Sequence, residues 1–171
     1  AFEEFSKYKP WCFDLVESIA ELNERIAAEA VAAIKAAGEA ARQILMITPV
    51  GPLDYSYWAR EANEKNVSCQ PLVTLSMDEY LDDDGNYITD DHPLSFRNFV
   101  QNSLIENLKP SLRPDPANIN FPDPHEPSKT TALVEAFSGA DICFGGFGIT
   151  GHFAFNDPPE PDEPCDDNEV R

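Results

Sequence analysis

The first long segment of the chain, residues 13–43, repeats apolar positions every three or four residues. Alanine, leucine and glutamate are common there, and these residues favour helices. We predict helical structure over this segment, with Asn23 and Gly38 as positions where a helix could be split or ended. The alanine-rich part, residues 26–41, would allow close packing against a sheet.

Two short apolar runs follow, and neither alternates with polar residues. They are ILMIT, residues 44–48, and PLVTLSM, residues 71–77. A continuous apolar run is typical of a strand that is covered on both faces. The other predicted elements are a helix at residues 57–64, a helix at residues 93–108 with Pro93 in its first turn, and strand edges at residues 117–120 and 140–146.

The alternation of helices and strands predicts an α/β fold in which a parallel sheet carries helices on both faces. Ligands bind such sheets at the carboxyl ends of the strands. Three places follow predicted strands and are therefore candidates for a site: Gly51, Asp78 and the segment 145–152. The proline- and acid-rich residues 159–171 are predicted to form a loop or tail outside the core.

Charge narrows the range of partners. The chain has 31 acidic and 12 basic residues, which gives a formal net charge of -19. Such a chain repels phosphate backbones and anionic lipids, so we expect neither a nucleic-acid nor a membrane partner. The apolar runs are also much shorter than the roughly 20 residues of a membrane span.

The four cysteines form no CxxC pair. We interpret them as reduced thiols of a cytoplasmic protein, with Cys143 buried in an apolar run, and we expect no metal site. The acidic residues 82–84 are followed by Gly85 and Asn86, but the segment lacks the remainder of an EF-hand calcium loop. A solvated loop is the simpler interpretation.

Asp78 and Glu79 directly follow the second predicted strand. A half-shielded carboxylate at a strand end can serve as a general base, because loss of water raises its pKa toward the working range. The alternative is a solvated pair of acids with no chemical role.

The segment GGFGITGHFAFNDP, residues 145–158, combines a glycine-rich turn with His152. Glycines let the backbone approach a ligand closely, and imidazole titrates near neutral pH, which suits acid–base chemistry on sugar oxygens. The alternative is a plain strand-exit turn with a structural histidine. The segment lacks the GxGxxG pattern and its distant acid, which argues against a dinucleotide site.

Four blocks in this order, VTLSMDEY, DHPLSFRNF, PANIN and GGFGITGHFAFNDP, resemble the glucosamine-6-phosphate deaminase (isomerase) family over roughly residues 30–160. The continuation HFAFNDP resembles the deaminases and not the related 6-phosphogluconolactonases. The resemblance implies one three-layer α/β/α domain over residues 1–171, built on a mostly parallel Rossmann-like sheet. It also implies a homo-oligomer.

The resemblance further implies a hydrolase that converts glucosamine 6-phosphate and water to fructose 6-phosphate and ammonia, with no metal or organic cofactor. Asp78 would move a proton between C2 and C1 of the sugar, and His152 would open the sugar ring. Asp157 stands where the family usually has glutamate and would support the histidine from farther away. The implied contacts with the phosphorylated amino sugar are Gly51, Glu79, Gly145, Gly146, Phe147 and Gly148.

Three features depart from the family pattern. Thr150 replaces the aspartate that partners the histidine, so a negative charge beside the imidazole is lost. The segment TPVGPLDYSY has one glycine, Gly51, and adds the charge of Asp54 where the family has a glycine- and threonine-rich phosphate loop. The chain ends at Arg171 where the family continues, so we expect the C-terminal part of the family fold to be missing.

These departures leave a second hypothesis open. The chain could be a divergent homologue without deaminase activity, either a sugar-binding or regulatory protein or an isomerase of another sugar.

Overall fold

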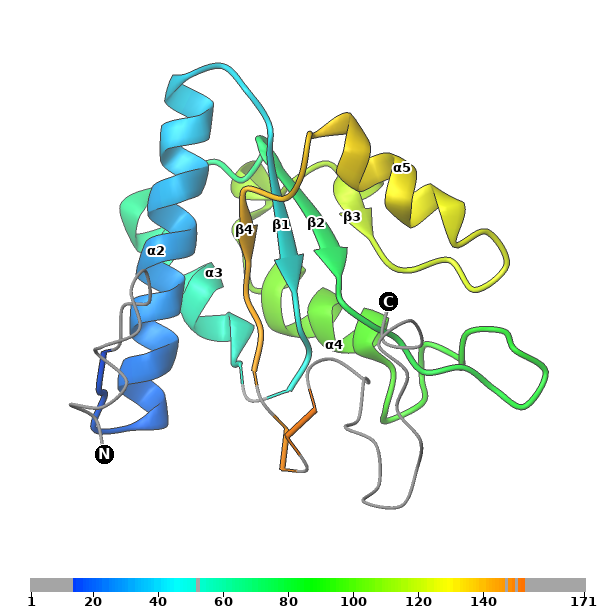
Figure 1. The fold of residues 1–171 in the computed structure, drawn as a ribbon. Helices are drawn as coiled ribbons and strands as arrows, with labels where there is room; N and C mark the ends of the chain where they lie inside the picture. The colour runs from blue at the N-terminus through cyan, green and yellow to red at the C-terminus, as the bar shows by residue number, and fades with distance from the viewer. Residues whose placement is uncertain (1–13, 52, 147, 150, 153–171) are drawn as a thin grey trace, which may run out of the picture.

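A parallel sheet forms the centre of the computed structural model, which describes residues 14–51, 53–146, 148–149 and 151–152 (Figure 1). The described strands pair in the order β3-β2-β1-β4, and each neighbouring pair is parallel. The α/β class with a parallel sheet is therefore confirmed. The strands are β1 (Ile44–Thr48), β2 (Leu72–Ser76), β3 (Ile119–Asn120) and β4 (Ile142–Cys143).

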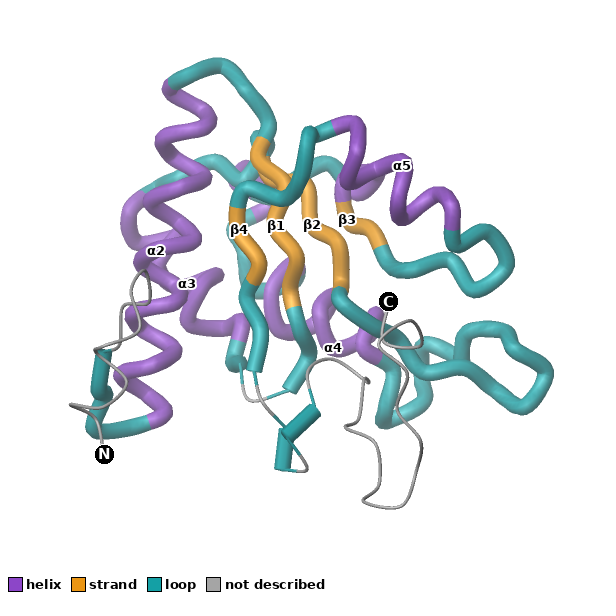
Figure 2. The backbone as a smooth tube through the Cα atoms, viewed as in Figure 1, coloured by secondary structure: helices purple, strands orange, loops and turns teal. Residues whose placement is uncertain are grey.

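Helices cover both faces of this sheet, and Figure 2 shows the strands between them. One face packs on α2 (Ile19–Glu39), α3 (Tyr55–Lys65) and the π-helical turn η1 (Gln101–Ile105), which continues α4 (Phe96–Val100). The other face packs on α5 (Ser128–Ala136). The chain therefore has the three layers of an α/β/α fold.

The side chains of β1 alternate between these two layers. Ile44 and Met46 belong to the larger hydrophobic cluster with α2 and α3, whereas Leu45 contacts the apolar residues of α5 and its C-terminal turn. Both sets are buried, which explains why the sequence of this strand shows no polar alternation.

Helix α2 is continuous, so the expectation that Asn23 could split it is wrong. Ser18 caps the helix by accepting a hydrogen bond from the Glu21 N–H at 3.1 Å. Asn23 is buried inside the helix, where its amide donates to the Ile19 carbonyl at 3.0 Å. Gly38 lies in the last turn, as expected for a position near a helix end.

The predicted helix at residues 93–108 is only partly regular. It begins at Ser95, whose hydroxyl accepts from the Asn98 N–H at 3.2 Å, so Pro93 lies outside the first turn and that prediction is wrong. After Val100 the backbone widens, and the Glu106 N–H bonds the Gln101 carbonyl at 2.9 Å, which is π-helical geometry.

The other predicted elements are present, with ends shifted by a few residues. Cys143, however, is exposed and not buried as expected. The reason is that β4 pairs with β1 on one side and, among the described residues, has no neighbouring strand on its other side. Cys69 is buried, and both described cysteines are free thiols.

Candidate active site

The chain order of the strands creates a switch point at the centre of the sheet. From β1 the connection runs to β2 and then β3 on one side, while β4 pairs with the opposite side of β1. Loops that leave neighbouring strands in opposite directions open a crevice at the carboxyl ends, which is where parallel sheets bind ligands. The loops after β1, β2 and β4 all leave this edge, at the bottom of Figure 1.

Asp78 lies two residues beyond the end of β2, at this edge. The Met77 N–H donates to the Thr48 carbonyl at 2.9 Å, which extends the pairing of β1 with β2 as far as the residue before Asp78. One carboxylate oxygen of Asp78 is buried and has no hydrogen-bond partner within the described part of the chain. Burial raises the pKa of Asp78, and the negative charge of Glu79 raises it further. A carboxylate with a raised pKa at such an edge has the chemistry to act as a general base.

Tyr55, at the start of α3, is a residue of this edge that sequence reasoning missed. Its ring is buried against Trp58 and Phe99, with ring centroids 5.9 and 6.1 Å away. Its hydroxyl donates to the Pro49 carbonyl and so fastens the loop after β1. Burial raises the pKa of Tyr55, a hydrogen bond with the Thr48 side chain lowers it, and the negative charge of Asp78 raises it.

Glu79 follows Asp78 but faces a different environment. Its side chain is only 2% exposed. Its carboxylate accepts hydrogen bonds from the Phe96 N–H at 3.0 Å and the Arg97 N–H at 2.8 Å, at the start of α4. The carboxylate is thus engaged in joining the end of β2 to α4, and its expected contact with substrate stays a prediction.

The glycine-rich turn after β4 folds back on itself. The Gly148 N–H donates to the His152 carbonyl, and the Gly151 N–H donates to the Gly148 carbonyl, both at 2.9 Å. Gly151 has φ +87°, a left-handed conformation that favours glycine. The His152 imidazole lies so close to Gly148 that a β-carbon there would overlap it, so the turn needs glycine at this position.

The loop after β1 contains the remaining described candidate, Gly51, which is exposed and has open space around its Cα. The loop leads into α3, which is capped by Asp54. The Asp54 N–H is itself held by the buried Asn23 side chain of α2, at 2.8 Å. No local pattern reveals this link, because its two residues are 31 positions apart.

The structure therefore brings Gly51, Asp78 and the described part of the glycine-rich turn, Gly145, Gly146, Gly148 and His152, to one edge of the sheet. Gly145 and Gly146 are exposed there, directly after β4. Phe147, Thr150 and Asp157 lie outside the described residues, as do residues 159–171.

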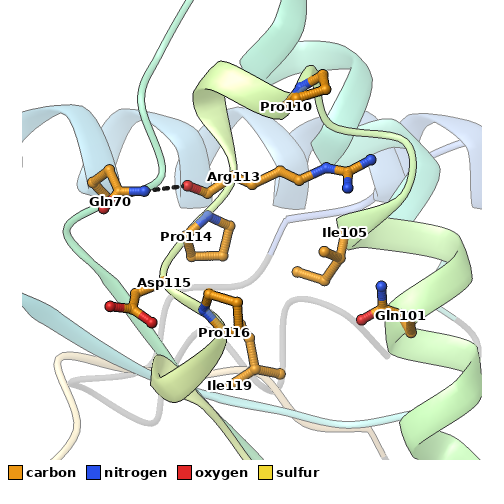
Figure 3. Close-up of a pocket in the computed structure, with 9 residues that line it drawn as sticks. All are labelled: Gln70, Gln101, Ile105, Pro110, Arg113, Pro114, Asp115, Pro116 and Ile119. Carbon is orange, nitrogen blue, oxygen red and sulfur yellow. Dashed lines mark hydrogen bonds between the residues drawn. The ribbon is translucent and has the colours of Figure 1, made fainter.

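A cavity of about 590 Å³ lies at the opposite edge of the sheet, where β2 and β3 begin (Figure 3). Ile105 and Ile119 form part of its wall, and the Arg113 guanidinium extends along it while bonding the Leu108 carbonyl at 3.2 Å. The cavity is thus separate from the candidate active site. Its lining residues are Gln70, Gln101, Ile105, Pro110, Arg113, Pro114, Asp115, Pro116 and Ile119.

Within the described ranges, no group of three or more histidine, cysteine, aspartate or glutamate side chains is arranged to hold a metal ion. A search of the same ranges for a helix long and apolar enough to cross a membrane finds none.

Comparison with known proteins links this geometry to amino-sugar enzymes. The chain is 33% identical over 153 residues to a glucosamine-6-phosphate deaminase of Parabacteroides distasonis, covering 84% of this chain and 54% of the relative. A glucosamine-6-phosphate deaminase of Porphyromonas gingivalis is 29% identical over 133 residues, covering 72% and 47%. The chain thus spans about half the length of these curated relatives. No protein-family model matches it.

Solved structures agree on the fold. A monomeric glucosamine-6-phosphate deaminase superposes with a TM-score of 0.68 at 20% identity, over 82% of this chain and 56% of that one. A 6-phosphogluconolactonase from Shewanella baltica gives a TM-score of 0.52 at 15% identity, over 85% and 60%. The sequence relatives support a divergent member of the glucosamine-6-phosphate deaminase family, and the solved structures support the fold.

Proposed function

We propose that this chain catalyses the isomerisation and deamination of an amino sugar. The reaction named by its relatives acts on glucosamine 6-phosphate, and by the family's chemistry water enters and fructose 6-phosphate and ammonia leave. The observation that carries the proposal is Asp78, a carboxylate at the switch-point edge with a raised pKa and a buried oxygen that has no hydrogen-bond partner among the described residues.

The proposed sequence of proton transfers uses two side chains. His152 moves the proton of the C1 hydroxyl to the ring oxygen, which opens the ring to the aldehyde. Asp78 then takes the proton from C2 and returns it to C1, while a proton passes from the amine nitrogen to the C1 oxygen, so that C1 becomes a hydroxymethyl group and C2 carries an imine. Water adds to C2 and ammonia leaves, which gives the ketose. A single carboxylate above C1 and C2 is enough for the second step.

The test is ammonia release from glucosamine 6-phosphate by the wild-type chain and by Asp78→Asn. We expect the variant to lose about 10²- to 10⁴-fold in kcat, because amide cannot accept the C2 proton. Asp83→Asn makes the same change on an exposed loop residue and should retain activity. Undiminished turnover by Asp78→Asn would remove Asp78 from the mechanism.

The same variant should show how much the partly buried charge of Asp78 lowers the free energy of unfolding. Its pKa is raised from 3.8, so between that pH and the raised value the folded chain binds more protons than the unfolded chain. The stability of the wild type therefore falls as pH rises through this window. Asn has no charge to bury, so we expect Asp78→Asn to be the more stable protein at pH 7 and to lose this advantage below about pH 4. Urea unfolding at several pH values measures the difference.

One observation favours the second hypothesis, a homologue that binds sugar without deaminating it. Thr150 removes a charge beside His152 in the sequence, and such partners contribute strongly to acid–base catalysis. Under this hypothesis, calorimetry detects binding of an amino sugar while ammonia release stays at the background rate in both the wild type and Asp78→Asn.

A further inference from the structure

We infer that the candidate active site selects against a phosphate ester, and that Asp54 is the specificity-determining residue. The preferred substrate is then an amino sugar without a phosphate group. This inference rests on the proposed function and narrows its substrate.

The first observation is that Asp54 uses the hydrogen-bond donors at the start of α3. Its carboxylate accepts from the Ser56 N–H at 2.9 Å, and its carbonyl accepts from the Tyr57 N–H at 3.2 Å. Its own N–H donates to the Asn23 side chain at 2.8 Å. Helix N-termini bind phosphate through such N–H groups. Here the chain's own carboxylate takes the anion's place.

The loop before α3 has few donors left to offer. Pro49 and Pro52 have no N–H, so only Val50, Gly51 and Leu53 can donate from the backbone between β1 and Asp54. The Pro49 carbonyl accepts a hydrogen bond from the Tyr55 hydroxyl, which ties the start of the loop to α3. A loop sequence with two prolines therefore offers few N–H groups to an anion.

The charges at this edge also disfavour a phosphate ester. Asp54 is exposed, and Asp78 adds a second carboxylate at the end of the neighbouring strand. Arg97, the arginine at the start of α4, is already bonded to Asp90 and to the Ile88 carbonyl, and lies 3.7 Å from Glu79. A phosphate ester carries about -1.5 to -2 charges at neutral pH and would be repelled, whereas the ammonium group of an amino sugar would be attracted.

The experiment compares ammonia release from glucosamine and from glucosamine 6-phosphate, in the wild type and in Asp54→Asn. Asparagine caps helices as well as aspartate does, so the variant removes the charge and keeps the cap. We expect the wild type to have the higher kcat/KM for glucosamine. In Asp54→Asn, the ratio of kcat/KM for the phosphorylated sugar over the free sugar should rise roughly tenfold, through KM.

Asp115→Asn is the matched control. Asp115 caps η3 (Pro116–Asn118) with the same geometry, accepting from the Ala117 N–H at 2.9 Å, but it lies at the opposite edge of the sheet. Its substitution makes the same change in charge and should leave the ratio unaltered.

Calorimetric affinities for the two sugars separate the possible failures. A wild type that prefers the phosphorylated sugar, with the same preference in Asp54→Asn, overturns the inference and leaves the proposed function intact. Absence of ammonia from both sugars overturns the proposed function, while the affinity ratio still tests Asp54. If neither sugar binds the folded wild type, both fail.

Discussion

Gly148 and His152 show how one residue can fix another at the candidate site. The imidazole occupies the space in which a side chain at position 148 would begin. Two hydrogen bonds between the backbones of Gly148, Gly151 and His152 hold the turn in this shape. The orientation of His152 therefore depends on the absence of a neighbouring side chain.

Gly148→Ala is expected to displace the His152 ring and to reduce ammonia release by about 10- to 100-fold, because a shift of about 1 Å in a catalytic group has effects of this size. Gly146→Ala is the control, since a β-carbon there would meet open space. Comparable activity in both variants would show that the position of His152 is unimportant. The histidine signals in NMR spectra of the two variants report the displacement directly.

Among single residues, the sequence identified those with an unusual local context. It did not identify residues whose role depends on partners far away in the chain. Asp78 and the glycine turn are recognisable because they directly follow apolar runs. Asn23 suggested a helix break, yet its side chain bonds Asp54 across 31 positions. Tyr55 belongs to no recognisable motif in the sequence. Its importance comes from packing that no short sequence pattern describes.

Between elements, the junction of β2 with α4 depends on Glu79. A carboxylate has two oxygens that accept hydrogen bonds, and Glu79 uses them for three backbone N–H groups, those of Tyr80, Phe96 and Arg97. The negative charge also favours the positive end of the helix. The junction fixes the course of the chain directly after Asp78.

Glu79→Gln should destabilise the fold by about 1.5–3 kcal/mol, because the amide nitrogen cannot accept a hydrogen bond and a charged interaction with the helix start is lost. Urea unfolding measures the change. Glu135→Gln, on the exposed side of α5, is the control and should alter the free energy of unfolding by less than about 0.5 kcal/mol. Equal stability of Glu79→Gln and the wild type would mean that the junction does not need the charge.

The sequence also located the strands better than the helices. ILMIT forms β1 over the predicted residues, since a doubly covered strand leaves an unbroken apolar run. Helix α5 was not predicted, because residues 128–136 have adjacent apolar residues in place of a helical spacing, and none of them is fully buried. The π-helical turn was missed because it is a variation of hydrogen bonding that helix propensity does not encode.

For the whole molecule, net charge is the dominant property. With a formal net charge of -19, the negatively charged side chains repel one another more strongly in the folded chain than in the expanded unfolded chain. This repulsion lowers the stability of the fold. The expected homo-oligomer and cytoplasmic location stay predictions. Association of such chains would also have to overcome this repulsion.

Salt should therefore stabilise the protein. Raising NaCl from about 20 mM to about 500 mM at pH 7 shortens the range of charge repulsion and should raise Tm by a few degrees. The same series at about pH 5, where part of the carboxylates are protonated, should give a smaller increase. A Tm that is constant or falls with salt at pH 7 would show that favourable ion pairs outweigh the repulsion.

The pairing of β1 with β4 has a consequence for the order in which the protein forms during synthesis. The Leu45 N–H donates to the Asp141 carboxylate across 96 positions. The ribosome therefore synthesises β1 well before β4, the strand that pairs with it on this side. At about 5–20 residues per second, the interval between completion of β2 and completion of β4 lasts several seconds. The nascent chain can pair β1 with β2 during this time, but the other side of β1 stays unpaired until β4 has been made. The edge that carries the candidate site is thus among the last parts of the described fold to be completed during synthesis.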